Sequence, residues 1–172
     1  MRRTLRIRSS GQSAVLIALV IVALVLIVGL AVDGSNAYVT QRKAQSAANA
    51  AAIAGTKRLA MARDNPGSYS DTDIRAEIDQ IVLENQFSPD EINAYYLDYY
   101  GNVIGEVGAI GGTDTPPPAN AAYIEVRVNR GLETYFIRLG GFSTVNVAAS
   151  TQAHNIATGA PGCTDGIYPI GV

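Results

Sequence analysis

The pattern of apolar and polar positions sets one segment of the chain apart from the rest. Residues 14–32 form a run of nineteen uncharged, apolar residues, and no acidic residue precedes Asp33. As a helix this run is roughly 28 Å long, close to the ~30 Å hydrocarbon core of a bilayer. Basic residues are concentrated before the run, at Arg2, Arg3, Arg6 and Arg8. The pattern predicts a membrane helix with its N-terminus in the cytoplasm and the following residues outside.

The helical pattern continues beyond the apolar run, because no proline occurs before Pro66 and residues 44–55 contain seven alanines in twelve positions. One face carries Gln41, Gln45 and Asn49, and the other carries Ala44, Ala47, Ala48, Ala51 and Ala54. We therefore expect one helix over about residues 11–62, ending before the turn signal at 64–67. The alanine face either packs on the chain's own sheet, which we favour, or contacts helices of other subunits.

The next segment predicts a short helix, a turn and a hairpin. Ser70 and Asp73 form a capping-box pattern ahead of apolar residues at helical spacing, so a helix ending near Asn85 is expected. Residues 88–91 are expected to form a single turn. The turn pair Gly101-Asn102 separates residues 95–99 from residues 103–107, and this arrangement predicts a β-hairpin.

The last part of the chain predicts two further strands. Residues 111–120, with three consecutive prolines, are expected to form an extended loop. Residues 123–129 and 144–153 alternate as strands do, and residues 132–139 read as a short amphipathic helix that ends at Gly140-Gly141. From residue 155 the chain reads as loop with an apolar finish, which indicates a fragment or a tail that docks. Together these elements predict an α+β fold, a long helix laid across a small antiparallel sheet in a pilin-like arrangement.

These elements suggest four regions along the chain. A basic cytoplasmic lead covers residues 1–13, the transmembrane helix residues 14–32, and its alanine-rich extracytoplasmic continuation residues 33–63. An extracytoplasmic α+β domain covers residues 64–172. About 140 residues follow the apolar run, which is enough for one modest domain with its own core.

Charge and cysteine content narrow the function classes. From Gly34 onward the chain has nine basic and fourteen acidic residues, a balance that argues against a nucleic-acid partner. Cys163 is the only cysteine, so the sequence allows no intrachain disulfide. It is either free, or paired between chains, or paired with a residue outside this sequence.

Catalytic chemistry finds little support in the sequence. His154 is the only histidine, and Cys163 is its only conceivable nucleophilic partner. The glycines of residues 105–112 lack the spacing and lysine of a phosphate loop, and helix capping explains Asp71-Thr72-Asp73 without calcium. Four tyrosines, Tyr95, Tyr96, Tyr99 and Tyr100, offer an aromatic patch of which half is expected in the core. We predict no catalytic, cofactor-binding or metal-binding residues and no cofactor.

The N-terminal part resembles a known family. The segment Gly11-Gln12-Ser13-Ala14, the apolar run, its exit at residues 29–33 and the alanine-rich helix of residues 41–55 together resemble TadE/TadG-like proteins of the Flp (tight-adherence) pilus system. Residues 131–153 resemble the C-terminal pattern of that family more loosely. TadE-like pseudopilins are cut after a glycine and carry a glutamate at the fifth following position, which counted from Gly11 is Leu16 here. This departure favours the TadG-like branch, whose members stay whole in the membrane.

Some TadG-like proteins carry a metal-dependent adhesion module built on Asp-x-Ser-x-Ser. Asp33-Gly34-Ser35-Asn36-Ala37 begins in this way but ends in alanine and follows a membrane helix, so we interpret it as coincidence.

The sequence thus predicts a non-enzymatic, single-pass component of a Flp/Tad-type pilus or secretion apparatus in the cytoplasmic membrane. The resemblance implies pilus subunits or Tad assembly proteins as partners, contacted through the alanine-rich helix and the outer domain, and the apolar run implies the lipid bilayer. The alternative is a secreted soluble binding or adhesion domain cleaved after Ala37, since small residues precede that position. Nineteen apolar residues exceed the ~7–15 of a typical signal-peptide core, which favours the anchored form.

Overall fold

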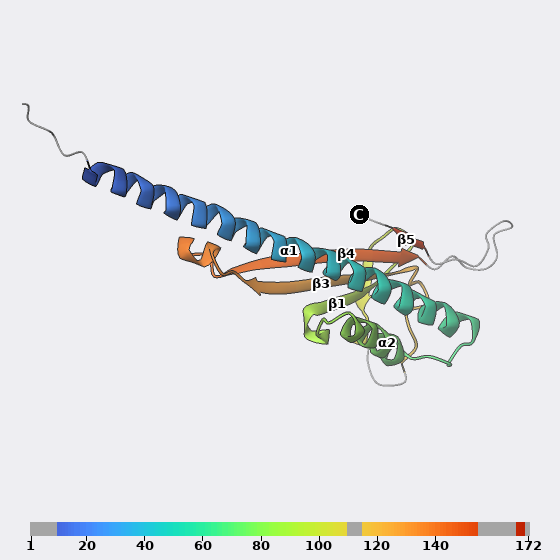
Figure 1. Cartoon of the computed structure of the whole chain (residues 1–172). Helices are drawn as coiled ribbons and strands as arrows, with labels where there is room; N and C mark the ends of the chain where they lie inside the picture. The colour runs from blue at the N-terminus through green and yellow to red at the C-terminus, as the bar shows by residue number, and fades with distance from the viewer. Residues whose placement is uncertain (1–9, 110–114, 155–167, 171–172) are drawn as a thin grey trace, which may run out of the picture. The chain divides into compact units, whose positions relative to one another are not determined.

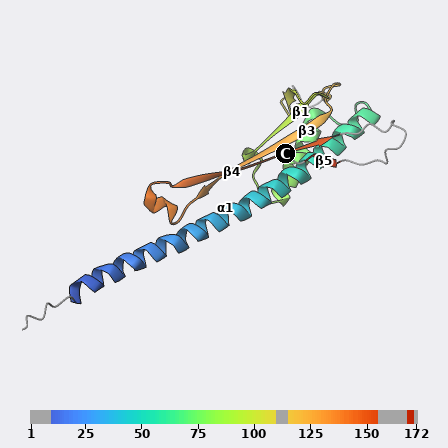
Figure 2. The same cartoon turned by 90° about the horizontal axis from the view of Figure 1, so that it is seen from above.

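The computed structural model describes residues 10–109, 115–154 and 168–170. It consists of a long helix, α1 (Ser10–Asp64), a second helix, α2 (Asp71–Glu84), and a five-stranded sheet, drawn in Figures 1 and 2. Two short 3-10 helices, η1 (Pro89–Glu91) and η2 (Ile137–Gly140), interrupt the chain. The α+β class predicted from the sequence is confirmed. By contacts the chain divides into two compact units, residues 1–38 with 132–145, and residues 39–131 with 146–172.

The strands lie in the order β2-β1-β3-β4-β5. Their bounds are β1 (Ile92–Leu97), β2 (Val103–Glu106), β3 (Tyr123–Glu133), β4 (Thr144–His154) and β5 (Tyr168–Ile170). The β1–β2, β1–β3 and β4–β5 pairs are antiparallel. The predicted hairpin, the turn at η1 and the strands β3 and β4 are therefore present. The final apolar segment pairs with β4 as β5, so part of the expected loop after residue 155 is a strand.

The helix α1 runs without interruption through the end of the apolar run, as the sequence predicts. Apolar side chains of residues 15–32 are largely exposed within the chain, and α1 is long and apolar enough to cross a membrane. The exposure changes in the second unit, where Ala44, Ala47, Ala48, Ala51 and Ala52 are fully buried. The alanine face thus packs on the chain's own domain, with Ala54 only half-buried. Gln45 and Asn49 also reach the sheet, because Gln45 Nε2 donates to Thr151 Oγ1 at 2.7 Å.

Both helices of the second unit cover one face of the sheet. Ile124 of β3 pairs with Tyr96 of β1, so their side chains lie on the same face. A Cβ added to Gly55 of α1 would lie 3.3 Å from Ile124 Cδ1, which puts α1 on this face. Tyr96 Oη donates to Asp71 at 2.9 Å, which ties the first residue of α2 to the same face. The core therefore lies between the sheet and the two helices.

The start of α2 follows the predicted capping box. Ser70 Oγ accepts from the backbone N–H of Asp73, while the Asp73 carboxylate accepts from the backbone N–H of Ser70 at 2.8 Å. The fully buried Asp71 carboxylate has a different task, because it accepts from Tyr96 Oη and from the backbone N–H of Gly108 at 2.8 Å. Burial, together with this hydrogen bond to the Asp71 carboxylate, raises the pKa of Tyr96, so Tyr96 stays a neutral donor.

One predicted element is wrong. Residues 132–139 do not form an amphipathic helix, since Leu132 and Glu133 continue β3 and only the four residues of η2 are helical. The predicted stop is right, because Gly141 ends η2 with φ of 93°. Leu139, the last residue of the predicted amphipathic helix, is highly exposed.

The alanine face is open to a direct test. Ala48→Leu inserts a larger side chain where Ala48 is fully buried, and we expect it to lower the free energy of unfolding by about 1–3 kcal/mol. The matched control is Ser46→Leu on the exposed side of the same turn, with an expected change of about 0.5 kcal/mol or less. Denaturant unfolding of the full chain in detergent micelles measures both. Equal effects of the two variants would contradict the packing described for this face.

Candidate functional site

The most unusual arrangement in the described structure surrounds Asp33, the first charged residue after the apolar run. Its side chain is only 6% exposed, although it lies on a helix whose preceding residues are mostly exposed. The partners come from the β3–β4 loop, residues 134–143, which belongs to the same compact unit. The carboxylate therefore joins segments that are about one hundred positions apart in the sequence.

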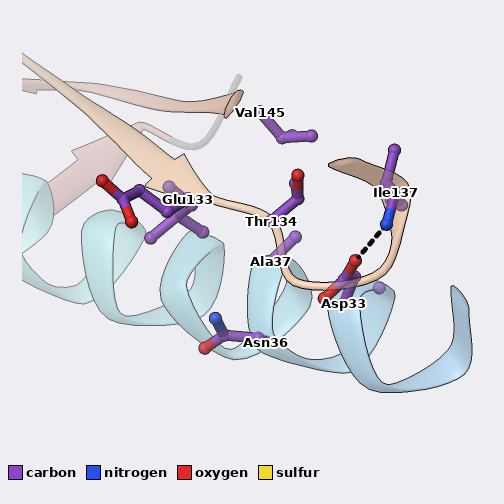
Figure 3. Close-up of a pocket in the computed structure, with 9 residues that line it drawn as sticks. Asp33, Asn36, Ala37, Glu133, Thr134, Ile137 and Val145 are labelled. Atoms are coloured by element: carbon purple, nitrogen blue, oxygen red, sulfur yellow. Dashed lines mark hydrogen bonds between the residues drawn. The ribbon is translucent and has the colours of Figure 1, made fainter. Parts of the chain in front are cut away.

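Three consecutive backbone N–H groups donate to this carboxylate. The N–H of Tyr135 donates to Oδ1 at 3.1 Å, and those of Phe136 and Ile137 donate to Oδ2 at 2.8 Å each. Figure 3 shows Asp33 pointing from α1 toward the loop, with the bond from Ile137 drawn. These N–H groups lie at the start of η2, where the first N–H groups of a helix have no acceptor within the helix itself. Asp33 thus acts as a cap supplied from α1, because Phe136, the N-cap of η2, makes no side-chain cap bond.

The same donors set the charge state of the cap. The hydrogen bond from the N–H of Ile137 lowers the pKa of Asp33 below its ordinary value of 3.8. The N–H groups of Tyr135 and Phe136 act in the same direction, while the burial of the carboxyl opposes them. Asp33 is consequently ionised at neutral pH, which is the state that accepts three hydrogen bonds most strongly.

An apolar contact accompanies the cap one turn earlier. A Cβ added to Gly29 would overlap the ring of Phe136, so only glycine admits this ring against α1. We call the combination of Asp33, the three N–H groups and the Gly29–Phe136 contact the Asp33 clamp. The loop is closed independently of the clamp, since the N–H of Thr134 donates to the Ser143 carbonyl at 3.1 Å and Thr134 Oγ1 to the Phe142 carbonyl at 2.6 Å.

A small cavity of about 170 Å³ lies beside the clamp. Its walls come from α1 and from both ends of the β3–β4 loop and include Leu132. Figure 3 labels Ala37, Ile137 and Val145 among the residues that line it. The cavity is below the roughly 300 Å³ at which small-molecule sites begin. Its polar groups include the Asp33 carboxylate, which is already occupied by backbone donors. The arrangement suits mechanical attachment of the loop to α1 rather than binding of a cofactor.

Of the two residues considered for catalysis from the sequence, the structure describes His154. Among the described residues, no group of three or more His, Cys, Asp or Glu side chains is placed to hold a metal ion. His154 stacks on Tyr123 with ring centroids 4.3 Å apart, and burial lowers its pKa. Cys163 lies outside the described residues.

The four tyrosines separate in the structure. Tyr96 is fully buried and Tyr95 is half-buried, with the Arg127 guanidinium 5.0 Å from its ring centroid. Tyr99 and Tyr100 are exposed and meet edge to face with ring centroids 5.8 Å apart. Half of the patch is expected in the core, but only Tyr96 of the four is fully buried.

Sequence reasoning missed the clamp. The sequence marks Asp33 only as the exit from the apolar run and as the start of an incomplete adhesion motif, and indicates no role for it. The available signal was its position, because a carboxylate at the edge of a long apolar helix is costly unless it is satisfied. The sequence does not indicate its donors, because a backbone N–H group is present whatever the side chain of the residue.

Comparison with known proteins supports the resemblance noted above. Residues 11–64 match the family model described as putative Flp pilus-assembly TadE/G-like. The match covers almost all of α1, including Gly29 and Asp33. No curated protein and no solved structure matches the chain.

The glycine contact predicts a difference between two glycines of the same helix. Gly29→Ala forces the Phe136 ring away from α1, so we expect the opening free energy of the amides of Tyr135, Phe136 and Ile137 to fall by about 1–3 kcal/mol. Gly34→Ala meets nothing within 4 Å and should leave these amides unchanged. Hydrogen exchange of the full chain in nanodiscs measures both variants, and equal protection in the two would contradict the contact.

The lowered pKa of Asp33 predicts a specific titration. A carboxylate whose pKa is depressed by folding stabilises the clamp above its unfolded pKa, and this stabilisation is lost as the pH falls through the folded value. The backbone amide resonances of Tyr135, Phe136 and Ile137 should therefore titrate together with a midpoint below 3.8. Asp33→Asn, which removes the titrating group, should abolish the transition. A midpoint at or above the ordinary value would show that the N–H groups do not hold the charge.

Proposed function

We propose that this chain is a single-pass, membrane-anchored component of a Flp/Tad-type pilus or secretion apparatus without enzymatic activity. The observation that carries the proposal is the family match over residues 11–64, because it covers both the apolar run and its alanine-rich continuation. The exposure of residues 15–32 supports the anchor, since large apolar side chains such as Leu19 and Ile27 have no protein neighbours to cover them in the described chain. The arginines before the run favour an N-terminus in the cytoplasm.

The Asp33 clamp gives the proposed anchor a mechanical role. A domain joined to its membrane helix only through the continuing backbone of α1 would transmit force through that one connection. The clamp adds a second connection within the same unit, where the β3–β4 loop holds α1 directly after the apolar run. This supports an architectural function, in which the loop stays attached to the helix of the proposed anchor.

The packing of the alanine face narrows where partners would bind. Ala44, Ala47, Ala48 and Ala51 are covered by the chain's own domain, so this stripe is not available to another subunit. The exposed residues of the same segment include Gln41, Arg42, Lys43, Ser46 and Lys57. Pilus subunits or Tad assembly proteins would therefore meet the polar face of the alanine-rich helix, together with the outer domain.

The alternative of a secreted domain cleaved after Ala37 fits less well. Such cleavage would remove both Gly29 and Asp33, and the N–H groups of Tyr135, Phe136 and Ile137 would lose their acceptor. Unpaired backbone donors are costly where water does not replace the lost partner. The clamp thus supports retention of the apolar segment.

Intact-mass analysis of the protein extracted from membranes of its native host tests the proposal. We expect a mass that retains the N-terminus from Met1 or Arg2, as in the TadG-like branch. Loss of residues 1–11 would keep the protein in the pilus system but as a processed pseudopilin. A chain that starts at Tyr38 and is recovered without membranes would overturn the anchored function.

A further inference from the structure

Three large apolar side chains on the β3–β4 loop have no protein cover in the described structure. Tyr135 is 72% exposed, Leu139 is 76% exposed and Phe142 is 67% exposed. The loop also carries the exposed Arg138, which precedes Leu139 in the chain. The loop is an ordered structure, since Thr134 closes it and the N–H of Leu139 donates to the Phe136 carbonyl at 3.0 Å. These side chains are therefore displayed on a defined support.

The Asp33 clamp determines at which residues of α1 this loop is attached. Phe136 packs on Gly29, which lies inside the apolar run of residues 14–32, and Asp33 holds the loop one turn later. Four residues of helix correspond to about 6 Å. If lipid surrounds residues 14–32, the loop consequently lies beside the last turn of the membrane span, where hydrocarbon gives way to headgroups.

We propose that the β3–β4 loop is a second membrane contact, with Tyr135, Leu139 and Phe142 inserted into the leaflet next to Asp33 and Arg138 directed to lipid phosphates. The proposal rests on the membrane anchor proposed above. The composition of the loop suits this layer, because tyrosine is enriched at membrane interfaces and arginine reaches phosphates while its stem stays apolar. A bilayer is the occupant that the geometry favours, since the exposed side chains adjoin the span itself.

A second contact would constrain α1 in a way that a single helix cannot. One apolar helix can rotate about its axis and tilt within a bilayer, and interfacial anchors limit both motions. Because the clamp holds the loop on one side of α1, insertion of the loop into the interface would fix the rotation of α1 about its axis and the direction of its tilt.

The absence of tryptophan from the chain makes the test simple. Leu139→Trp and Phe142→Trp each place a single fluorophore at an exposed position of the loop, where folding is little affected. Leu24→Trp marks the apolar run, and Tyr100→Trp marks an exposed position of the β1–β2 turn. Each full-length variant is reconstituted in phosphatidylcholine–phosphatidylglycerol vesicles with and without lipids brominated on their acyl chains, which quench tryptophan on contact.

We expect the Leu139→Trp and Phe142→Trp variants to lose emission to an extent comparable with Leu24→Trp, while Tyr100→Trp keeps its emission. Quenching of Leu24→Trp without quenching of either loop variant would overturn the second contact and leave the anchor intact. A blue-shifted but unquenched loop variant would indicate cover by protein, such as a second copy, and would also overturn it. No quenching of Leu24→Trp would overturn the anchor itself.

Discussion

The hydrogen bonds between the Asp33 carboxylate and three backbone N–H groups are the interaction on which the first compact unit depends. A charge at the edge of nineteen uncharged residues loses hydration, and only good donors offset that cost. The N–H groups of Tyr135, Phe136 and Ile137 supply them at 2.8–3.1 Å. The loop is stabilised as well, because the N–H groups at the start of η2 obtain an acceptor that the N-cap side chain of η2 does not provide. The carboxylate on α1 and the N–H groups of the β3–β4 loop thus supply each other's hydrogen-bond partners.

The helix α1 serves two environments with one continuous backbone. Over residues 15–32 its large apolar side chains are exposed in the chain, as suits contact with lipid. Over residues 44–52 small alanines are buried against the chain's own domain, where a larger side chain would separate helix and sheet. The change of side-chain size along one helix coincides with the change from exposed to buried positions. Gly29 is an exception, because its lack of a Cβ admits Phe136.

The elements whose pattern is local were predictable. The bounds of α1 follow from apolar and alanine content without a proline, and the start of α2 follows from the reciprocal bonds of Ser70 and Asp73. Residues 123–129 alternate as a strand does, and Ile124, Val126 and Val128 on one face of that strand are all buried. The predicted helix over residues 132–139 failed for a non-local reason. Its apolar spacing suits a helix, but β3 extends to Glu133 and the Asp33 carboxylate accepts from the N–H groups of Tyr135, Phe136 and Ile137.

The sequence by itself determined the membrane-length apolar helix, its alanine-rich continuation, the α+β class and the resemblance to TadE/TadG-like proteins. Each of these depends on composition or on spacings within about one helical turn or one strand, where neighbouring residues decide the conformation. Only the tertiary structure decided that Asp33 is a cap and that Gly29 receives a ring. It also decided that β5 adds to the edge of β4. These contacts use backbone groups and the missing side chain of a glycine, brought together from segments about one hundred residues apart, and such pairings have no local pattern.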